Sequence, residues 1–249
     1  MKNNRTVERT VAILDLLSKH PQGLSLSEIK DHLDIPKTSA YDIIVTLQNN
    51  QMVEILDERL KIYGIGIKTF TIGNRYTANL DVIKVAKPFI EELGKNLKKT
   101  IFLGVMTGMK IVYIDKYSPK DEILTTCAIG SENGLHCTSL GKAILAYVPN
   151  YEEIKKHLKL YKKTENTIDN FEDLDKELAA TRARGYSIDN REHREHMFCS
   201  GAPIFDHNGR VIAAISNTGL YDKNKDYQPE FEMVKQAAEN ISSKLGYRK

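Results

Sequence analysis

The chain has 249 residues, and its 36 Lys and Arg against 33 Asp and Glu give a net charge of +3 at pH 7 with neutral His. This length favours two domains, and the chain contains no apolar run of about 18 residues that would predict a membrane span. The start Met-Lys-Asn-Asn-Arg has no apolar core, so we expect no secretory signal. Three cysteines are too few for a disulfide framework. We therefore expect a cytoplasmic protein with reduced thiols.

A first helix of about three turns is predicted near the N-terminus. Apolar residues recur there at helical spacing, at Val7, Val11, Leu14 and Leu17. Residues 20–23 include Pro and Gly, which predict the end of this helix.

Two short helices joined by a tight connection are predicted next. Ser25 and Glu28 have the S-x-x-E spacing of a capping box. Leu26, Ile29 and Leu33 then recur on one face. At the start of the second helix, proline suits the first turn because its missing N–H would have no partner there, and Pro36 stands at that place.

The second of these helices has two faces of different character. One face is apolar and should be buried; it carries Ala40, Ile43, Ile44 and Leu47. The opposite face is polar, as in a recognition helix that contacts phosphates and base edges. Its side chains are Lys37, Thr38, Ser39, Tyr41 and Asp42.

A β-hairpin is predicted after the helices. Its strands are expected at 52–56 and 60–63, around the turn 57–59. Arg59 at the tip and Lys61 on the return strand can then reach a minor groove or the DNA backbone. Three helices followed by a hairpin make a winged helix-turn-helix, so we expect a duplex DNA operator as partner. The alternative is a helical subdomain used only for packing.

Charge supports DNA binding only weakly. Residues 1–77 hold ten Lys or Arg against nine Asp or Glu, a net charge of +1. Phosphate contacts need cations on one surface, although such charges can also be ordinary solvated groups. A module with this charge would need a dimer for useful affinity. The predicted DNA-binding residues are Arg5, Arg9, Ser25, Pro36, Lys37, Thr38, Ser39, Tyr41, Asp42, Arg59 and Lys61.

The rest of the chain mixes helices with strands. Gly and Asn turns at 107–110 and 206–209 predict antiparallel hairpins, and Pro88 either kinks a helical region or begins a new helix. Antiparallel strands with helices grouped around them predict an α+β domain of the ligand-sensing type. Helices are expected at 67–76, 80–86, 88–97, 139–147, 171–184 and about 229–245, and strands at 101–106, 111–114, 123–127, 201–205 and 211–216.

Four stretches in order carry a family resemblance. They are 35–41, 135–143, 184–189 with Glu192, and 202–206 with 209–216. Over nearly its whole length the chain resembles the IclR family of bacterial transcriptional regulators. The resemblance implies a winged helix-turn-helix at 1–64, a linker helix at 65–79 and a GAF-like effector-binding domain with an antiparallel sheet at 80–249. It also implies a homodimer or a dimer of dimers, acting as repressor or activator.

One residue departs from the family pattern. Asp42 follows Tyr41, where many members place an Arg. A carboxylate at this place would repel phosphate, so DNA contacts from this position, or the target sequence, are expected to differ.

The family-like segments also contain the residues expected to line an effector cavity. A small organic or sugar acid needs donors, which backbone N–H groups at the start of the 139–147 helix would supply. Apolar walls would exclude water and hydroxyls would fix orientation, while Asp189 would accept hydrogen bonds from ligand hydroxyls. For a single residue, ordinary packing is the alternative. The predicted members are Met106, His136, Cys137, Leu140, Asp189, Met197, Cys199, Ser216 and Thr218.

A metal site is the first competing reading of these segments. His193, His196 and Cys199 have close ligand spacing, and Asp189 and Cys137 could complete a tetrahedral site. No paired CxxC motif supports it, and histidines in such a charged run are most often solvated. We therefore expect no metal.

An enzyme is the second competing reading. A thiol nucleophile at Cys137 would need a base beside it, but the adjacent His136 would point to the opposite face of a strand. A ligand-free DNA-binding protein is a third reading, yet the size of the second domain favours sensing. We expect a repressor of a catabolic operon under a small metabolite, with no catalytic residues and no cofactor.

Overall fold

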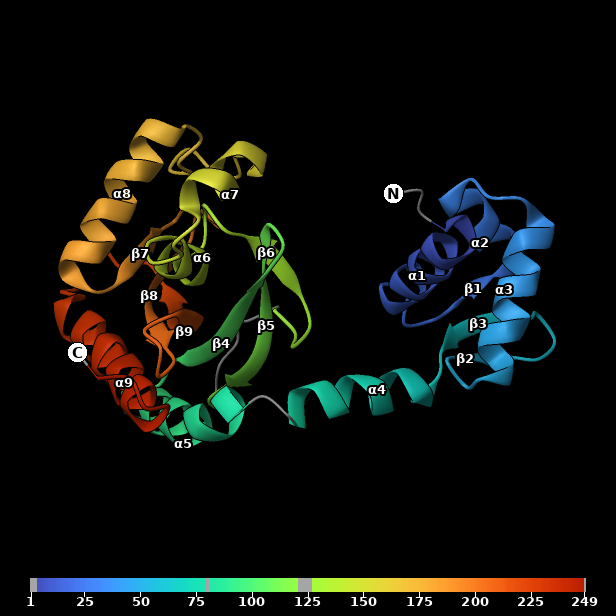
Figure 1. Cartoon of the computed structure of the whole chain (residues 1–249), viewed down its shortest axis with the longest axis horizontal. Helices are drawn as coiled ribbons and strands as arrows, with labels where there is room; N and C mark the ends of the chain where they lie inside the picture. Colours follow the sequence, from blue (N-terminus) through green and yellow to red (C-terminus); the bar gives the residue numbers. More distant parts are fainter. Residues whose placement is uncertain (1–3, 79–80, 121–126, 249) are drawn as a thin grey trace. The chain divides into compact units, whose positions relative to one another are not determined.

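The computed structural model describes residues 4–78, 81–120 and 127–248, and the chain forms two compact units, residues 1–79 and 80–249 (Figure 1). The first unit contains four helices and a small sheet among its described residues. Its elements are α1 (Arg5–Ser18), β1 (Leu24–Ser25), α2 (Leu26–Leu33), α3 (Lys37–Asn49), β2 (Val53–Asp57), β3 (Ile62–Ile65) and α4 (Ile67–Ala78).

Helix α1 packs on the core through its C-terminal half only. Ile13 and Leu17 are buried, whereas Val7 and Val11 are 58% and 61% exposed. The prediction that Val7 and Val11 belong to the buried stripe is therefore wrong. Helical spacing identified a face but not the point along the helix at which the core ends.

The capping box of α2 is confirmed. The Glu28 amide donates to the Ser25 Oγ at 3.3 Å, and the Ser25 amide donates to Glu28 Oε2 at 2.7 Å. Asp34 ends the helix in the left-handed region at φ +48°. Pro36 is the N-cap residue of α3 rather than its first helical residue, with ψ at +136°. The predicted apolar face of α3 is buried as expected: Ala40, Ile43, Ile44 and Leu47.

The wing has a longer turn than predicted and an additional strand. Strands β2 and β3 pair antiparallel across the turn 58–61, with a register shift after Ile55. The short β1 also pairs with β3, Leu24 opposite Tyr63, so the sheet order is β1-β3-β2. A two-residue strand is too short to produce a recognisable sequence pattern, which is why β1 was missed.

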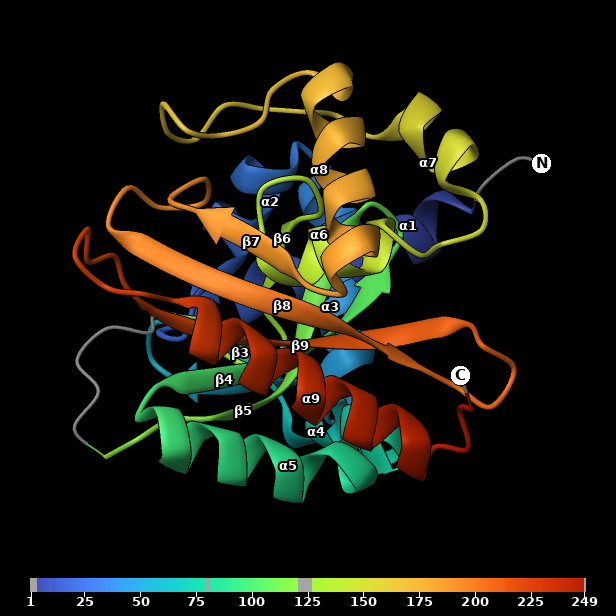
Figure 2. The ribbon, with the colours of Figure 1, turned by 90° about the vertical axis from the view of Figure 1, so that its left-hand side faces the viewer.

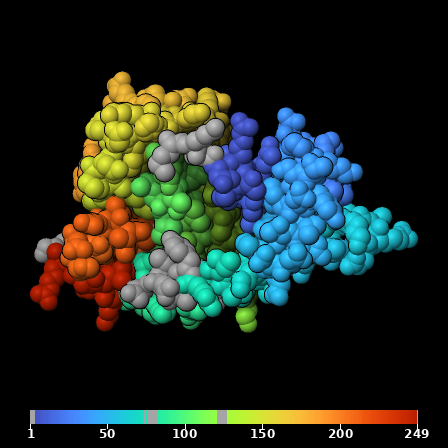
Figure 3. Space-filling model, turned by 45° about the vertical axis from the view of Figure 1, so that its right-hand side comes forward, coloured from blue at the N-terminus to red at the C-terminus, as the bar shows by residue number. Residues whose placement is uncertain are grey.

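Helix α4 begins one residue after the wing. Ile67 and Phe70 are 64% and 66% exposed, and Ile72 is 51% exposed. The wing and α4 fall in the cyan range of the bar in the surface view of Figure 3. None of the helices in the described part of the chain is long and apolar enough to cross a membrane.

The second unit is built on one antiparallel sheet with the strand order β6-β5-β4-β9-β8-β7. Helices α5 and α9 cover one face, and α6, α7 and α8 lie on the other (Figure 2). Its elements are α5 (Asp81–Leu97), β4 (Thr100–Thr107), β5 (Lys110–Tyr117), β6 (Glu132–Gly134), α6 (Ser139–Leu145), α7 (Tyr151–His157), α8 (Phe171–Arg184), β7 (Ser187–Asn190), β8 (Met197–Phe205), β9 (Val211–Leu220) and α9 (Gln228–Lys244).

These elements confirm the predicted α+β class with an N-terminal winged helix-turn-helix. Helix α5 runs without interruption through Pro88, which is exposed. Elements β6, α7 and β7 were not predicted, because segments of three to seven residues carry little periodicity. Of the strand predicted at 123–127, residues 123–126 lie outside the described residues.

The capping box generates the first prediction. Replacing Ser25 by Ala removes the side-chain acceptor of the Glu28 amide, and should lower the local stability of the helix-turn-helix by about 1 kcal/mol. Hydrogen exchange of the amides of residues 26–47 in the full-length protein measures this loss. The control Ser27→Ala alters an exposed serine of the same helix and should change stability by less than about 0.5 kcal/mol. Equal effects of the two substitutions would refute the capping role.

Candidate DNA-binding surface and effector cavity

Helix α3 presents the polar face that the sequence predicted. Lys37, Thr38 and Asp42 are exposed, and Tyr41 is 52% exposed. These side chains follow the first turns of α3, opposite its buried stripe, so the helix has an accessible polar surface at its N-terminal end. Pro36 is also exposed there.

Arg9 is held against this helix. Its Nη1 donates a hydrogen bond of 3.0 Å to the Ser39 Oγ, which is half-buried. A guanidinium has five N–H donors, so the remaining N–H groups can bind a phosphate. Arg5, one turn earlier on α1, is exposed. Arg9 and Ser39 therefore form one unit of the predicted surface.

The tip of the wing is ordered by an aspartate. Asp57 Oδ1 accepts hydrogen bonds of 2.8 Å from the amides of Arg59 and Leu60. Lys61 pairs with Glu58 at 2.6 Å, and this hydrogen bond raises the pKa of the Lys61 ammonium. Part of the charge of Lys61 is therefore offset within the turn, whereas Arg59 is exposed and has no ion pair among the described residues.

Ser25 has a different role from the one predicted. Its hydroxyl bonds to Glu28 Oε2 at 2.7 Å within the capping box. This bond, with the cap itself, occupies the side chain, so Ser25 stabilises α2 rather than presenting a free hydroxyl.

A small cavity of about 50 Å³ lies in the second unit between α6 and the sheet. Six of the nine predicted effector residues line it, and they come from α6 and strands β7, β8 and β9. They are Leu140, Asp189, Met197, Cys199, Ser216 and Thr218.

Strand register brings these residues together. Asp189 pairs with Cys199, and Cys199 pairs with Thr218, so the three form a row across β7, β8 and β9. Ser216 lies opposite Phe102 of β4. The row places one carboxyl, one thiol and one hydroxyl group on the same wall, where they can contact one ligand.

Seven lining residues were missed. Phe102 belongs to the first expected strand, and only the pairing of β4 with β9 reveals that it lies beside Ser216. Thr138 caps α6 by accepting from the Gly141 amide at 3.1 Å, a signal that was present in its sequence. The missed residues are Phe102, Tyr113, Cys127, Thr138, Ser139, His193 and Arg194.

Three predicted effector residues lie elsewhere. Met106 is part of the hydrophobic cluster formed with α6, α7 and α8. His136 Nε2 is 3.0 Å from the carbonyl oxygen of Tyr161, whose ring packs edge-on against the imidazole at 4.6 Å. Cys137 is buried, and burial raises the pKa of its thiol to about 11. The predicted grouping is corrected for Met106, His136 and Cys137, because the turn before α6 directs the last two toward Tyr161.

A buried charge cluster adjoins the cavity. The Lys142 ammonium is fully enclosed and lies 2.5 Å from Glu192 Oε1. Asp189 Oδ1 accepts from the amides of Glu192 at 2.8 Å and His193 at 3.2 Å. Burial and the neighbouring Glu192 carboxylate raise the pKa of Asp189 to about 7, against the opposing effect of Lys142. Asp189 therefore titrates near neutrality, so its carboxyl group can either donate or accept a hydrogen bond.

The competing metal site is not assembled. His193 Nε2 lies 2.7 Å from Asn133 Oδ1, and His196 is exposed. Within residues 4–78, 81–120 and 127–248, no three His, Cys, Asp or Glu side chains are grouped so that they could hold a metal ion.

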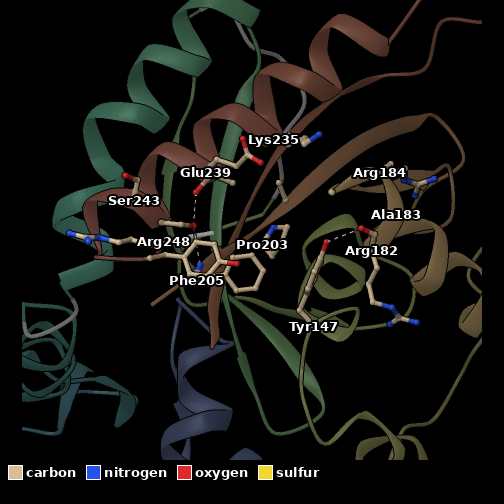
Figure 4. A pocket seen from close by; sticks show the side chains of 15 residues that line it. Tyr147, Arg182, Ala183, Arg184, Pro203, Phe205, Lys235, Glu239, Ser243 and Arg248 are labelled. Atoms are coloured by element: carbon tan, nitrogen blue, oxygen red, sulfur yellow. Dashed lines mark hydrogen bonds between the residues drawn. The ribbon is translucent and has the colours of Figure 1, made fainter. Parts of the chain in front are cut away.

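A larger cavity of about 530 Å³ lies between α8, β8 and α9 and contains none of the predicted effector residues (Figure 4). Its polar groups bond within the fold. Ser242 Oγ donates to the Ala238 carbonyl at 2.7 Å and accepts from the Phe205 amide at 3.0 Å, while Arg182 donates to the Ala146 carbonyl at 3.0 Å. The convergent polar groups typical of a ligand site occur instead in the smaller cavity.

Comparison with known proteins identifies relatives along the whole chain. The family model described as "Bacterial transcriptional regulator IclR C-terminal" matches residues 74–243, and "IclR helix-turn-helix domain" matches residues 6–56. The transcriptional repressor AllR of Klebsiella pneumoniae is 32% identical over 251 aligned residues, covering 99% of this chain and 92% of that protein.

Two solved structures are also similar. The IclR protein of Thermotoga maritima is 34% identical with a TM-score of 0.76, covering 97% of this chain and 99% of that one. An IclR homologue of Microbacterium hydrocarbonoxydans, complexed with 4-hydroxybenzoate, shares the fold with a TM-score of 0.85 at 20% identity, covering 96% and 98%. The named relatives are transcriptional regulators, which agrees with the predicted absence of enzymatic activity.

The raised pKa of Asp189 generates the second prediction. Because the folded state holds this proton more tightly than the unfolded state, stability falls as pH rises from about 4 to about 7. Asp189→Asn keeps the Oδ1 acceptor and removes the charge. Its gain in unfolding free energy over the native protein should be absent below pH 4 and should grow to at most about 4 kcal/mol above pH 7. Urea denaturation across this range measures the difference, and parallel curves would contradict it.

Proposed function

Because the chain belongs to the IclR family of bacterial transcriptional regulators, we propose that it represses a catabolic operon in the cytoplasm under the control of a small organic acid. The observation that carries the proposal is the accessible polar face of α3, at which Lys37, Thr38 and Tyr41 are exposed. A regulator of this kind needs one surface that reads DNA and one cavity that senses a metabolite, and the two units supply one each.

On DNA, α3 lies in the major groove with its N-terminal residues toward base edges. Lys37 and Arg9 bind phosphates on either side, and Arg59 of the wing binds the backbone or the adjacent minor groove. Asp42 cannot approach a phosphate, but its carboxylate can accept a hydrogen bond from a cytosine amino group. Asp42 therefore contributes to the choice of operator sequence.

The active species is a homodimer or a dimer of dimers. Ile67 and Phe70 of α4, with Val7 and Val11 of α1, are large apolar side chains that the chain itself leaves more than half exposed. A second copy can cover them and set the distance between recognition helices. A palindromic operator requires a spacing of roughly 34 Å or a multiple.

The effector is a small carboxylic acid bound in the cavity beside Asp189. A cavity of about 50 Å³ has room for about four water-sized groups, which suits an acid with two or three carbons. The hydroxyls of Ser216 and Thr218 orient it, and backbone N–H groups at the start of α6 bind its carboxylate. The ligand 4-hydroxybenzoate of the Microbacterium homologue illustrates that a related fold accepts an organic acid. A sugar acid would require the cavity to widen.

The DNA-binding surface gives the third prediction. Lys37→Ala and Arg59→Ala should each weaken operator binding and lower the slope of log affinity against log salt by about 0.9, one phosphate contact each. Fluorescence anisotropy with an operator found by genome-wide footprinting measures both quantities. The control Lys19→Ala changes an exposed lysine that pairs with Asp15 on its own helix, and it should leave the slope unchanged. Unaltered operator binding in both test variants would show that the docking surface is elsewhere.

Coupling between the two sites gives the fourth prediction. If an acid from a thermal-shift panel changes operator affinity by some factor, the operator must change the affinity for that acid by the same factor. Calorimetric titration of the acid with and without operator duplex measures this. Equal affinities in the two titrations would refute control of DNA binding by the cavity ligand.

A further inference from the structure

The small cavity opens into a wider space at its mouth. A second cavity of about 460 Å³ shares Cys127, His193 and Arg194 with it, and also includes Asn133 and Lys163. We call the space lined by these five residues the vestibule. It offers a continuous path from the surface to Asp189 and the ligand-sized space behind it.

The mouth is narrowed by one hydrogen-bonded contact. His193 Nε2 lies 2.7 Å from Asn133 Oδ1, although the two residues are 60 positions apart in the chain. The Asn133 amide also reaches the Tyr113 hydroxyl at 3.3 Å and Cys127 Sγ at 3.9 Å. Asn133 therefore ties both sides of the mouth to Tyr113 on the cavity wall.

The charges around this mouth are unequal. Lys163 and Arg194 line the vestibule, and its one acid, Glu132, forms an ion pair with Lys110. The Lys163 ammonium lies 5.6 Å from the centroid of the Tyr161 ring, and no carboxylate among the described residues pairs with it. Burial together with Lys163 and Arg194 lowers the pKa of His193 to about 4, so its imidazole adds no charge at neutral pH.

We propose that the vestibule is an anion-selecting entry site, in which Lys163 and Arg194 draw small carboxylates toward the cavity and disfavour neutral and cationic compounds. This inference rests on the proposed effector cavity and adds the route and the charge class of the ligand. Oriented cations at the mouth of a low-dielectric cleft raise the local concentration of anions and their rate of entry. Lys163 and Arg194 thus determine specificity before the ligand meets Asp189.

Cys127 is a natural reporter of this potential, because its half-buried thiol lines both the vestibule and the cavity. Two methanethiosulfonate reagents of similar size, one with a sulfonate and one with a trimethylammonium group, form the same type of mixed disulfide and release the same sulfinate. The full-length protein is treated at low salt, and modification of Cys127 is followed by peptide mass spectrometry. Rates are divided by those of the unfolded chain. Because both reagents attack the same thiolate, the ratio of their rates cancels changes in the thiol pKa.

The anionic reagent should react faster than the cationic one by about tenfold, and the preference should fade at high salt. Lys163→Gln and Arg194→Gln should each reduce it several-fold. Lys159→Gln is the matched control, since Lys159 lines the neighbouring cavity around His136 and not the vestibule. A ratio near one, or a preference unchanged in both test variants, overturns the proposal.

If Cys127 reacts with neither reagent, Ser131→Cys places a second reporter in the same space. Absence of reaction at both positions also overturns the proposal, since an entry route must admit molecules of this size. The measurement needs no effector and no DNA. A preserved anion preference together with a failed coupling experiment would therefore reject the proposed regulation while leaving the vestibule in place.

Discussion

The second unit depends on how it accommodates one enclosed cation. The Lys142 ammonium has no exposed surface and contacts Glu192 at 2.5 Å and Glu177 at 3.7 Å, and Glu177 in turn binds Arg184 at 2.5 Å. An unpaired charge at this depth would cost several kcal/mol. The turn that carries Glu192 and the helix that carries Glu177 must therefore remain packed against α6. One ammonium thus ties together α6, α8 and the turn after β7.

The same cluster governs the shape of the effector cavity. Asp189 accepts the amides of Glu192 and His193, so the turn that supplies the partner of Lys142 also supplies the cavity's carboxyl group and the histidine at its mouth. One carboxylate oxygen of Glu192, Oε2, is buried without a hydrogen-bond partner among the described residues, and burial raises the pKa of this group. A ligand that binds against Asp189 acts on a turn with an unsatisfied polar atom. Small displacements there change the stability of the whole cluster.

Local signals predicted the first unit better than the second. The capping box at Ser25 and the apolar stripe of α3 depend on residues within one or two turns, so the sequence was sufficient for them. The cavity depends on strand register: Cys199 and Thr218 are neighbours only because β8 pairs with β9. Family-like segments identified six lining residues without that register, but they could not show that His136 turns toward Tyr161. Nor did a lysine in the apolar helix at 139–147 reveal that its charge would be enclosed.

The weak charge of the DNA-binding unit and its exposed apolar residues follow from one constraint. Lys61 is partly offset by Glu58 and Asp42 repels phosphate, so a single copy can form few phosphate contacts. Because log affinity changes in proportion to the number of phosphates neutralised, joining two copies doubles that number without increasing the charge of either. Exposed Phe70 and Val11 provide apolar surface for such a union at about 25 cal/mol per Å² buried. Specificity then comes from the spacing of two weak readers, each of which binds random duplex poorly.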